Sequence, residues 1–291
     1  VTTIDASGMG EGGSFVQTGR SSTAASTYTG SDGNDTFQMK HGDDAIDAGA
    51  GTADKLVVSK NLILGGIAVD LSKTDDQVTT FNGNANTAVT KGFENVDLSG
   101  ITGNFGAEVT AIKGGSTITG TSNVDVFTGG AGSDKFAYTA DSLLFNGSNA
   151  IIDSITGGDG TDAIQINNNG LATFNIVAND SWASNLTSVE SIEAAGDTNQ
   201  IISVILNANA HNNGIVTVDL SNDGLAGQTN VINVSNENEA RAFTLTGSAG
   251  IDQITGGAGG DTIKGGAADD VLSGGDGADN IDGEAGADTI T

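Results

Sequence analysis

Aspartates recur every nine residues near the carboxyl end of the chain, and a regular row of carboxylates is a row of candidate cation ligands. Residues Gly247 to Thr291 divide without remainder into five nonapeptides: GSAGIDQIT, GGAGGDTIK, GGAADDVLS, GGDGADNID and GEAGADTIT. The sixth position is an aspartate in all five, giving the series Asp252, Asp261, Asp270, Asp279 and Asp288. Ca²⁺ is a hard cation that prefers six to eight oxygen ligands from carboxylates and carbonyls. We therefore predict Ca²⁺ sites formed by these aspartates and the Gly-rich loops.

The same unit recurs upstream. GSDGNDTFQ, MKHGDDAID and GAGTADKLV form a first block, and GTSNVDVFT and GGAGSDKFA form a second, which weaker units ending in IIDSIT and GGDGTDAIQ extend. The sixth-position aspartates of these blocks complete the predicted metal ligands: Asp35, Asp44, Asp54, Asp125, Asp134, Asp153 and Asp162. Calcium is therefore expected in separate clusters along the chain.

Other acids fall outside the sixth-position series, and solvent-exposed turn residues are their simplest interpretation. This applies to Asp43, Asp269, Asp276 and Asp282. Four more acids lie in the segments between blocks and are expected to face solvent along a coil, with additional cation binding as the less favoured alternative: Glu94, Asp97, Glu190 and Glu193.

A repeated strand and loop must position the aspartates. The first six residues of each unit predict a Gly-rich loop, and the last three predict a minimal strand with an inward aliphatic side chain at position eight: Ile254, Ile263, Leu272, Ile281 and Ile290. Two units then complete one flattened turn, so aspartates eighteen residues apart stack on one side. One inward aliphatic per unit is a thin core, and calcium should supply the missing stabilisation.

The segments between the blocks predict further strands. IAVDLS, IISVIL, IVTVDL and NVINVS alternate polar and apolar residues with period two, and no convincing amphipathic helix is present. FENVDLSG from Phe93 and VESIEAAG from Val189 share one pattern, which suggests two copies of a larger module. The predicted fold class is all-β, a parallel β-roll or β-helix solenoid with Gly-Asp-rich calcium-binding turns.

These features predict six regions. They are a β-rich lead-in (1–29), repeat block 1 (30–57), a β-coil spacer (58–119), repeat block 2 (120–165), a β-coil spacer with an insertion (166–246) and repeat block 3 (247–291). Because the chain starts without Met and stops inside a repeat, we expect it to be a fragment of a longer protein.

Composition limits the function classes. Ten basic and 37 acidic residues give a formal net charge of -27, which argues against nucleic acid or an anionic membrane as a direct partner. The chain has 45 Gly and no Pro, which suits tight turns joined to unbroken hydrogen-bond ladders. It has no Cys and therefore no disulfide, and no apolar run long enough for a transmembrane segment.

No catalytic motif is found. A zinc protease needs HExxH, but the only histidines are His41 and His211, in unrelated contexts, and the GxSxG of a lipase is absent. Paired acids of a glycosidase stay open among so many carboxylates, although structural calcium ligation is favoured. We expect a protein that is not an enzyme.

The tandem nonapeptides resemble the haemolysin-type calcium-binding repeats of the RTX family. This resemblance implies a secreted protein that leaves a Gram-negative cell by type I secretion and folds on external Ca²⁺. Ala268, Glu284 and Ser248 depart from the motif by replacing glycines, which leaves the geometry of their sites open. The FENVDLSG pattern between scattered blocks resembles surface-layer and large adhesin proteins.

The favoured function is thus a calcium-dependent structural protein of the cell surface, a surface layer or extracellular filament that self-associates. Two alternatives remain. One is an adhesin stalk or ligand-binding module for a cell-surface polysaccharide or other adhesion target. The other is the calcium-binding segment of a secreted hydrolase or toxin.

Overall fold

A computed structural model describes residues 3–10, 15–17, 25–167, 173–178, 182–196, 201–207, 210, 212–236 and 240–291. Two compact units divide the chain: unit 1 is Val1–Phe136 with Asp153–Gly160, and unit 2 is Ala137–Ile152 with Thr161–Thr291. Parallel strand pairs dominate, whereas β9 (Val78–Phe81) pairs in antiparallel fashion with both β8 (Ile67–Asp70) and β10 (Asn84–Ala85). The predicted all-β parallel solenoid is confirmed.

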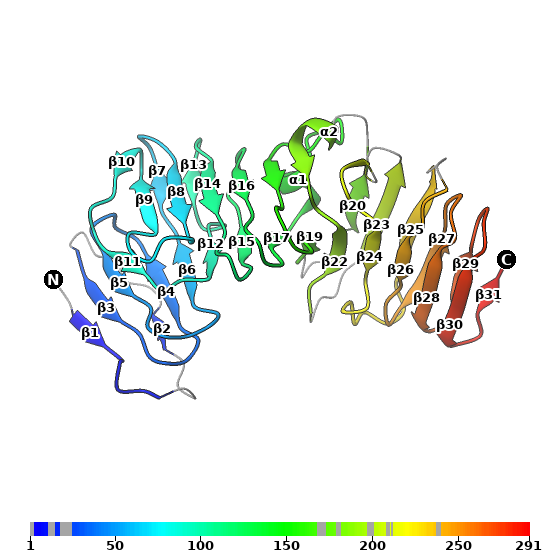
Figure 1. The fold of residues 1–291 in the computed structure, drawn as a ribbon, viewed down its shortest axis with the longest axis horizontal. Coiled ribbons are helices and arrows are strands. Elements are labelled where there is room, and N and C mark those ends of the chain that lie inside the picture. Colours follow the sequence, from blue (N-terminus) through cyan, green and yellow to red (C-terminus); the bar gives the residue numbers. More distant parts are fainter. Residues whose placement is uncertain are drawn as a thin grey trace. The chain divides into compact units, whose positions relative to one another are not determined.

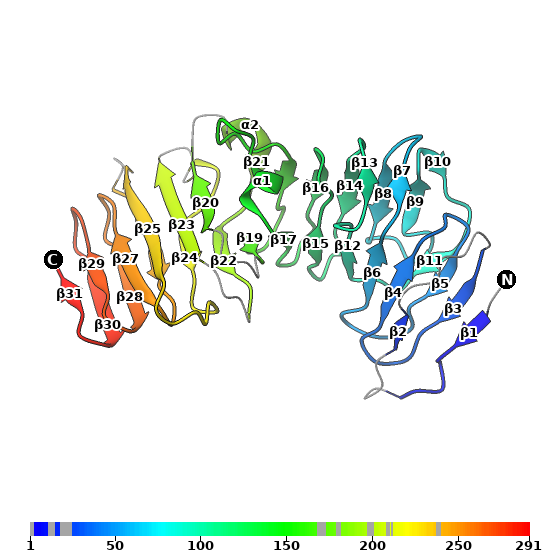
Figure 2. The ribbon, with the colours of Figure 1, turned by 180° about the vertical axis from the view of Figure 1, so that it is seen from behind.

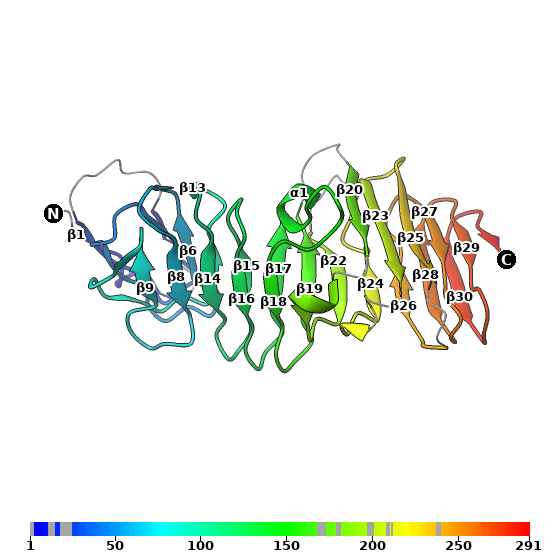
Figure 3. The same cartoon turned by 90° about the horizontal axis from the view of Figure 1, so that it is seen from above.

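Unit 1 is built from short strands that pair with the corresponding strand one coil later. They are β1 (Thr3–Asp5), β2 (Val16–Gln17), β3 (Thr27–Thr29), β4 (Thr36–Met39), β5 (Ala45–Asp47), β6 (Lys55–Val58), β7 (Asn61–Leu62), β8 (Ile67–Asp70), β9 (Val78–Phe81), β10 (Asn84–Ala85), β11 (Thr90–Lys91), β12 (Asn95–Asp97), β13 (Thr102–Gly103), β14 (Ala107–Thr110), β15 (Thr117–Thr119), β16 (Val126–Thr128) and β18 (Ser154–Thr156). The strand orders within the unit are β1-β3-β5-β11, β2-β4-β6-β12-β15, β10-β9-β8-β14-β16-β18 and β13-β7. Figure 3 shows β8, β14 and β16 side by side.

Unit 2 repeats this architecture with two sheets, ordered β19-β22-β24-β26-β28-β30 and β20-β23-β25-β27-β29-β31. The strands of unit 2, of which all but β21 belong to these two sheets, are β19 (Ala163–Ile166), β20 (Thr173–Val177), β21 (Leu186–Thr187), β22 (Ser191–Ala194), β23 (Ile201–Asn207), β24 (Thr217–Asp219), β25 (Thr229–Asn236), β26 (Thr244–Thr246), β27 (Ile251–Thr255), β28 (Thr262–Ala267), β29 (Val271–Ser273), β30 (Asn280–Ala285) and β31 (Thr289–Ile290). Strand β17 (Lys135–Tyr138) spans the boundary of the units. Figure 1 shows β23, β25, β27 and β29 following one another, and Figure 2 shows the same succession from behind.

Two short helices interrupt the strands, α1 (Asp141–Leu144) and α2 (Trp182–Asn185). Each has four residues, too short for the amphipathic periodicity of a helix to show in the sequence. The Trp182 ring is buried and stacks on Phe145 with ring centroids 5.5 Å apart. These aromatics therefore belong to the core of unit 2.

The strand register explains how the repeats stack. In the last block Gln253 pairs with Val271 and Thr262 pairs with Asn280, an offset of eighteen residues. This offset places position-eight residues above one another, and Ile254, Ile263 and Leu272 are fully buried between the two sheets. The core is a narrow row of aliphatic side chains, flanked by loops that carry the aspartates.

Candidate metal centre

The position-six residues of repeats that lie on the same side of successive coils form a column. In the last block the backbone N–H of Asp252 donates to Asp270 Oδ1 at 2.8 Å, and the N–H of Asp270 donates to Asp288 Oδ1 at 3.0 Å. On the opposite side, the N–H of Asp261 donates to Asp279 Oδ1 at 2.8 Å. Each carboxylate therefore lies directly over the residue one turn away.

The blocks of unit 1 repeat this contact. The N–H of Asp35 donates to Asp54 Oδ1 at 2.6 Å, and the N–H of Asp125 donates to Asp153 Oδ1 at 2.8 Å. This contact does not require a spacing of eighteen residues, because the donor and acceptor aspartates are separated by 19 residues in the first pair and by 28 in the second. What counts is that the two residues occupy equivalent places in adjacent coils.

Each carboxylate also turns back onto its own loop. The N–H of the position-two residue donates to the aspartate four residues later, from Ser248 to Asp252 and from Gly257 to Asp261, both at 2.7 Å. The pairs Thr121–Asp125 and Gly130–Asp134 do the same at 2.7 and 2.8 Å. The carboxylate of one aspartate thus accepts an N–H from its own loop and an N–H from the position-six residue of the preceding coil. This explains why the motif needs a short acid at position six.

The same folding back requires glycine at position one. A Cβ at Gly247 would lie 2.7 Å from Asp252 Oδ2 and would collide with the carbonyl oxygen of Gly265 in the next coil. A Cβ at Gly265 would lie 2.5 Å from Asp270 Oδ2 and 2.7 Å from the Gly283 carbonyl oxygen. Carboxylate and carbonyl oxygens therefore lie close to the position-one glycine, in the space that a side chain would occupy.

Burial makes these carboxylates costly as anions. Asp54 and Asp252 are fully buried, and burial is the main cause that raises the pKa of each to about 7. Neighbouring carboxylates add to this, Glu94 and Asp35 for Asp54, and Asp270 and Asp223 for Asp252. Burial also raises the pKa values of Asp125, Asp134 and Asp270. A nearby cation would reverse this penalty.

Some oxygens of these buried carboxylates lack a hydrogen bond altogether: Asp54 Oδ2, Asp252 Oδ1 and Asp270 Oδ2. Buried polar atoms in native proteins almost always have a partner, so an unsatisfied atom needs an explanation. Bound Ca²⁺ provides one, because it accepts several oxygen ligands in a flexible geometry. Among the described residues, no group of three or more His, Cys, Asp or Glu side chains is arranged to hold a metal, so a Ca²⁺ site here needs oxygen ligands beyond the carboxylates, such as the loop carbonyls that lie beside them at Gly265 and Gly283. The donor set fits Ca²⁺ on these terms.

The predicted ligands differ in how many carboxylates they have beside them. Hydrogen bonds join Asp35 to Asp54 and Asp125 to Asp153 in unit 1, and Asp252 to Asp270, Asp270 to Asp288 and Asp261 to Asp279 in unit 2. Asp134 also accepts the N–H of Ser116 at 2.7 Å, and Asp162 donates its N–H to the carboxylate of Glu190 at 2.8 Å. Most predicted ligands therefore lie in stacked acid pairs, as a shared ion needs.

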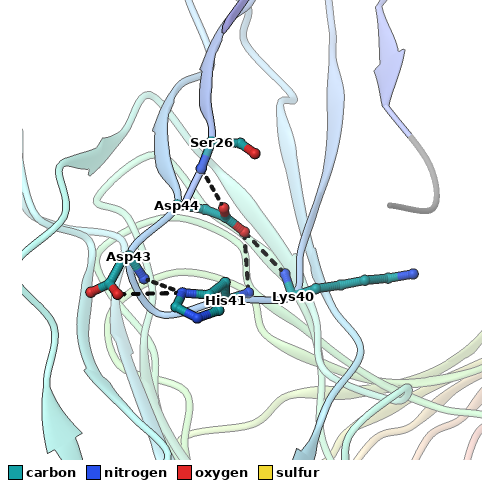
Figure 4. A network of polar contacts seen from close by, with 5 residues as sticks. All are labelled: Ser26, Lys40, His41, Asp43 and Asp44. Atoms are coloured by element: carbon teal, nitrogen blue, oxygen red, sulfur yellow. Dashed lines mark hydrogen bonds and ion pairs between the residues drawn. The ribbon is translucent and has the colours of Figure 1, made fainter. Parts of the chain in front are cut away.

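Asp44 has a different environment, shown in Figure 4. Its Oδ1 accepts from the N–H of Ser26, and its Oδ2 accepts from the N–H of His41 at 3.1 Å and of Lys40 at 3.4 Å. The preceding coil thus offers Ser26, not an acid, at the equivalent place. Asp43 is exposed and pairs with His41 Nδ1 at 3.4 Å. His211, the other histidine, lies outside the described residues.

The expectation that Glu94 and Glu190 face solvent was wrong. Both are half-buried, and each accepts the N–H of a position-six aspartate: Asp54 to Glu94 Oε2 at 2.7 Å and Asp162 to Glu190 Oε2 at 2.8 Å. Coil stacking places them in the acid column, because the next residues pair as Asn95 with Lys55 and Ser191 with Ala163. The shared FENVDLSG and VESIEAAG pattern contained this signal.

Asn230 is another residue that sequence reasoning missed. It pairs with Asp252 across adjacent coils, and its Oδ1 accepts the N–H of Ile202 at 2.8 Å. Its Nδ2 donates to Asp223 Oδ2 at 2.9 Å, and both side chains are buried. An amide therefore continues the column where the acidic block begins. By contrast, Asp269, Asp276 and Asp282 are exposed, as expected for turn residues.

Comparison with known proteins gives one family. The RTX calcium-binding nonapeptide repeat (4 copies) matches residues 113–140, 244–267 and 255–290. No curated protein and no solved structure is significantly similar to the chain. Within the described residues, no helix has the length and hydropathy needed to cross a bilayer.

Proposed function

We propose that this chain, which carries RTX calcium-binding nonapeptide repeats, binds Ca²⁺ at several sites and that calcium drives its folding and self-association as a non-catalytic structural protein of the bacterial cell surface. RTX repeats are typical of secreted proteins. The favoured assembly is a surface layer or an extracellular filament.

The buried carboxylate oxygens without hydrogen bonds carry the folding part of this proposal. Asp54, Asp252 and Asp270 each keep such an oxygen inside a chain of net charge -27. Without a cation, this arrangement combines desolvation of each charge with repulsion between stacked neighbours. Calcium removes both penalties at once, so the folded state should depend on it.

Exposed apolar side chains in unit 1 support self-association. Val124 is 62% exposed and Val126 is 43% exposed, and they line a hollow of about 400 Å³ together with Ile67 and Phe105. Ile63 and Leu64, each 69% exposed, precede Gly66, which also lines this hollow. Large apolar side chains exposed on a highly charged chain mark a contact surface, and a second copy is the occupant we propose.

The folding part is tested by titrating the protein with a chelator while following far-ultraviolet circular dichroism and thermal unfolding. We expect excess EGTA to weaken the β signal and to lower the melting temperature, and both to recover on adding Ca²⁺ but not the same concentration of Mg²⁺. Retained β structure with an unchanged melting temperature in EGTA would overturn it.

The assembly part is tested by light scattering and electron microscopy at millimolar Ca²⁺. Sheets or fibres are expected for the wild type, and replacing Leu64 and Val124 together by Ser should prevent them while leaving calcium-dependent folding intact. A wild-type protein that stays monomeric, with no sheet or fibre, would show that this chain does not assemble.

A binding module is the second candidate, and one feature of unit 1 favours it. Lys40, His41 and Lys60 lie around a hollow of about 300 Å³ with the aromatic ring of Phe81 and the amide of Asn82. Amide, cationic and aromatic groups together suit a cell-surface polysaccharide. Glycan binding by monomeric protein that is lost on changing Lys60→Ala would favour an adhesin over an assembly subunit.

A further inference from the structure

The acid column does not stop at the last nonapeptide aspartate of a block. In block 3 the N–H of one column aspartate donates to the carboxylate of the next, as Asp252 does to Asp270 at 2.8 Å. The N–H of Asp54 makes this same bond to Glu94 at 2.7 Å, and the N–H of Asp162 makes it to Glu190 at 2.8 Å. Each glutamate therefore occupies the place that another repeat would give to aspartate.

These positions lack a calcium-binding loop of their own. VTKGF precedes Glu94 and NLTSV precedes Glu190, and neither follows the GGxGx pattern. A carboxylate at these positions can therefore contribute a ligand only to the loop of the preceding coil, the loop that carries Asp54 or Asp162. Glutamate has one more methylene than aspartate, which lets its carboxylate reach across without a tight loop to hold it.

Asp54 provides an independent sign of a ligand at the first of these places. Its side chain is fully buried, its Oδ1 accepts the N–H of Asp35, and its Oδ2 has no hydrogen bond. The bond from its own N–H to Glu94 fixes the glutamate carboxylate beside this coil. Two carboxylates and an unsatisfied buried oxygen together are suited to a divalent cation.

We propose that Glu94 and Glu190 are further Ca²⁺ ligands that complete a terminal metal site, one with Asp54 and the other with Asp162. This inference rests on the calcium binding proposed above. It gives the spacer motif a chemical role: the glutamate of FENVDLSG and of VESIEAAG ends a calcium block by closing its last site.

The test removes the charge and keeps the hydrogen-bond acceptor. Glu94→Gln and Glu190→Gln retain a side-chain oxygen for the aspartate N–H, whereas Glu108→Gln, at an exposed position in β14, is the matched control. Calcium bound per chain is measured by equilibrium dialysis and the individual affinities by calorimetry, both on the full chain. Each column variant should lose one ion or weaken one site by about tenfold or more, and the double variant should lose two.

The outcomes separate this inference from the general calcium proposal. Wild-type protein that binds no Ca²⁺ overturns both, whereas wild-type binding with unchanged stoichiometry and affinities in both variants overturns only the role of the glutamates. If a variant loses its folded circular dichroism signal, recovery at higher Ca²⁺ supports a ligand role. Failure to recover at any Ca²⁺ concentration shows a structural role and overturns the inference.

Discussion

At the scale of single residues, position six combines two tasks that oppose each other without a cation. The aspartate must be buried to close its turn and bond to the next coil, yet burial penalises its charge. Asp252 shows both, since its Oδ2 accepts from Ser248 while its Oδ1 has no partner. Substitutions at this position should therefore affect the calcium-free and calcium-bound states in opposite directions.

Asp252→Asn is expected to leave the calcium-free protein as stable as the wild type or more so, because a buried charge is removed. With Ca²⁺ at a hundredfold above its dissociation constant, loss of one site should reduce the free energy of unfolding by about 2.7 kcal/mol. Thermal unfolding with and without Ca²⁺ measures both effects. Asp276→Asn, at an exposed position off the column, should change neither; equal calcium stabilisation of wild type and Asp252→Asn would contradict a ligand role.

Two residues that stand where the repeat motif has glycine have a strained backbone conformation. Ala268 at position four has φ of 80° and Glu284 at position two has φ of 63°, where the motif elsewhere places glycine. A side chain in this left-handed region costs about 1–2 kcal/mol. These two residues keep the turn geometry at the expense of stability.

Ala268→Gly should therefore raise the free energy of unfolding by about 1 kcal/mol, although glycine normally destabilises through backbone entropy. Chemical denaturation at saturating Ca²⁺ provides the measurement. Ala267→Gly, one residue earlier and not at positive φ, is the control and should destabilise instead. The interpretation fails if both substitutions destabilise equally.

At the scale of elements, the strands of the last block are two to six residues long and are stabilised by the side chains that they bury and by pairing with the next coil. Position eight supplies the core side chain of each coil. Ile263 is fully buried between paired strands, whereas Ile290, in the same series, is 52% exposed. The repeat is chemically uniform, but its contribution to stability is not.

Ile263→Ala should cost about 2–5 kcal/mol because it opens a cavity in the narrow core. Ile290→Ala should change the free energy of unfolding by no more than about 0.5 kcal/mol, as at other exposed sites. Both are measured by denaturation in saturating Ca²⁺. Similar costs at the two positions would mean that the last coil is covered in solution.

At the scale of the whole molecule, acid excess makes the folded state sensitive to protons as well as to calcium. The pKa values of Asp54 and Asp252 rise from 3.8 to about 7 in the folded chain. Between these values the calcium-free folded state binds more protons than the unfolded state. Its stability must then fall as pH increases through this window.

Calcium-free protein should consequently melt at a higher temperature at pH 5 than at pH 7.5, while saturating Ca²⁺ should remove or reverse the difference because protons compete for the same oxygens. Calorimetry of protein from which Ca²⁺ has been removed by chelation and gel filtration into calcium-free buffer, and of protein in Ca²⁺, tests both parts. The combined variant Asp54→Asn with Asp252→Asn should flatten the pH dependence of the calcium-free melting temperature. This result would separate the titration of these two buried carboxylates from the general effect of net charge. Calcium-free stability that increases from pH 5 to 7.5 would refute this account.

The nonapeptide period by itself determined the parallel coil, the inward aliphatic series and the stacking of aspartates eighteen residues apart, because every one of these follows from local spacing. Tertiary structure alone decided which residues continue the column outside the repeats. Glu94 reaches Asp54 across 40 residues and Glu190 reaches Asp162 across 28, distances set by the length of the intervening coils. No local motif encodes such a distance, and only the backbone register between neighbouring coils places a spacer glutamate over a buried aspartate.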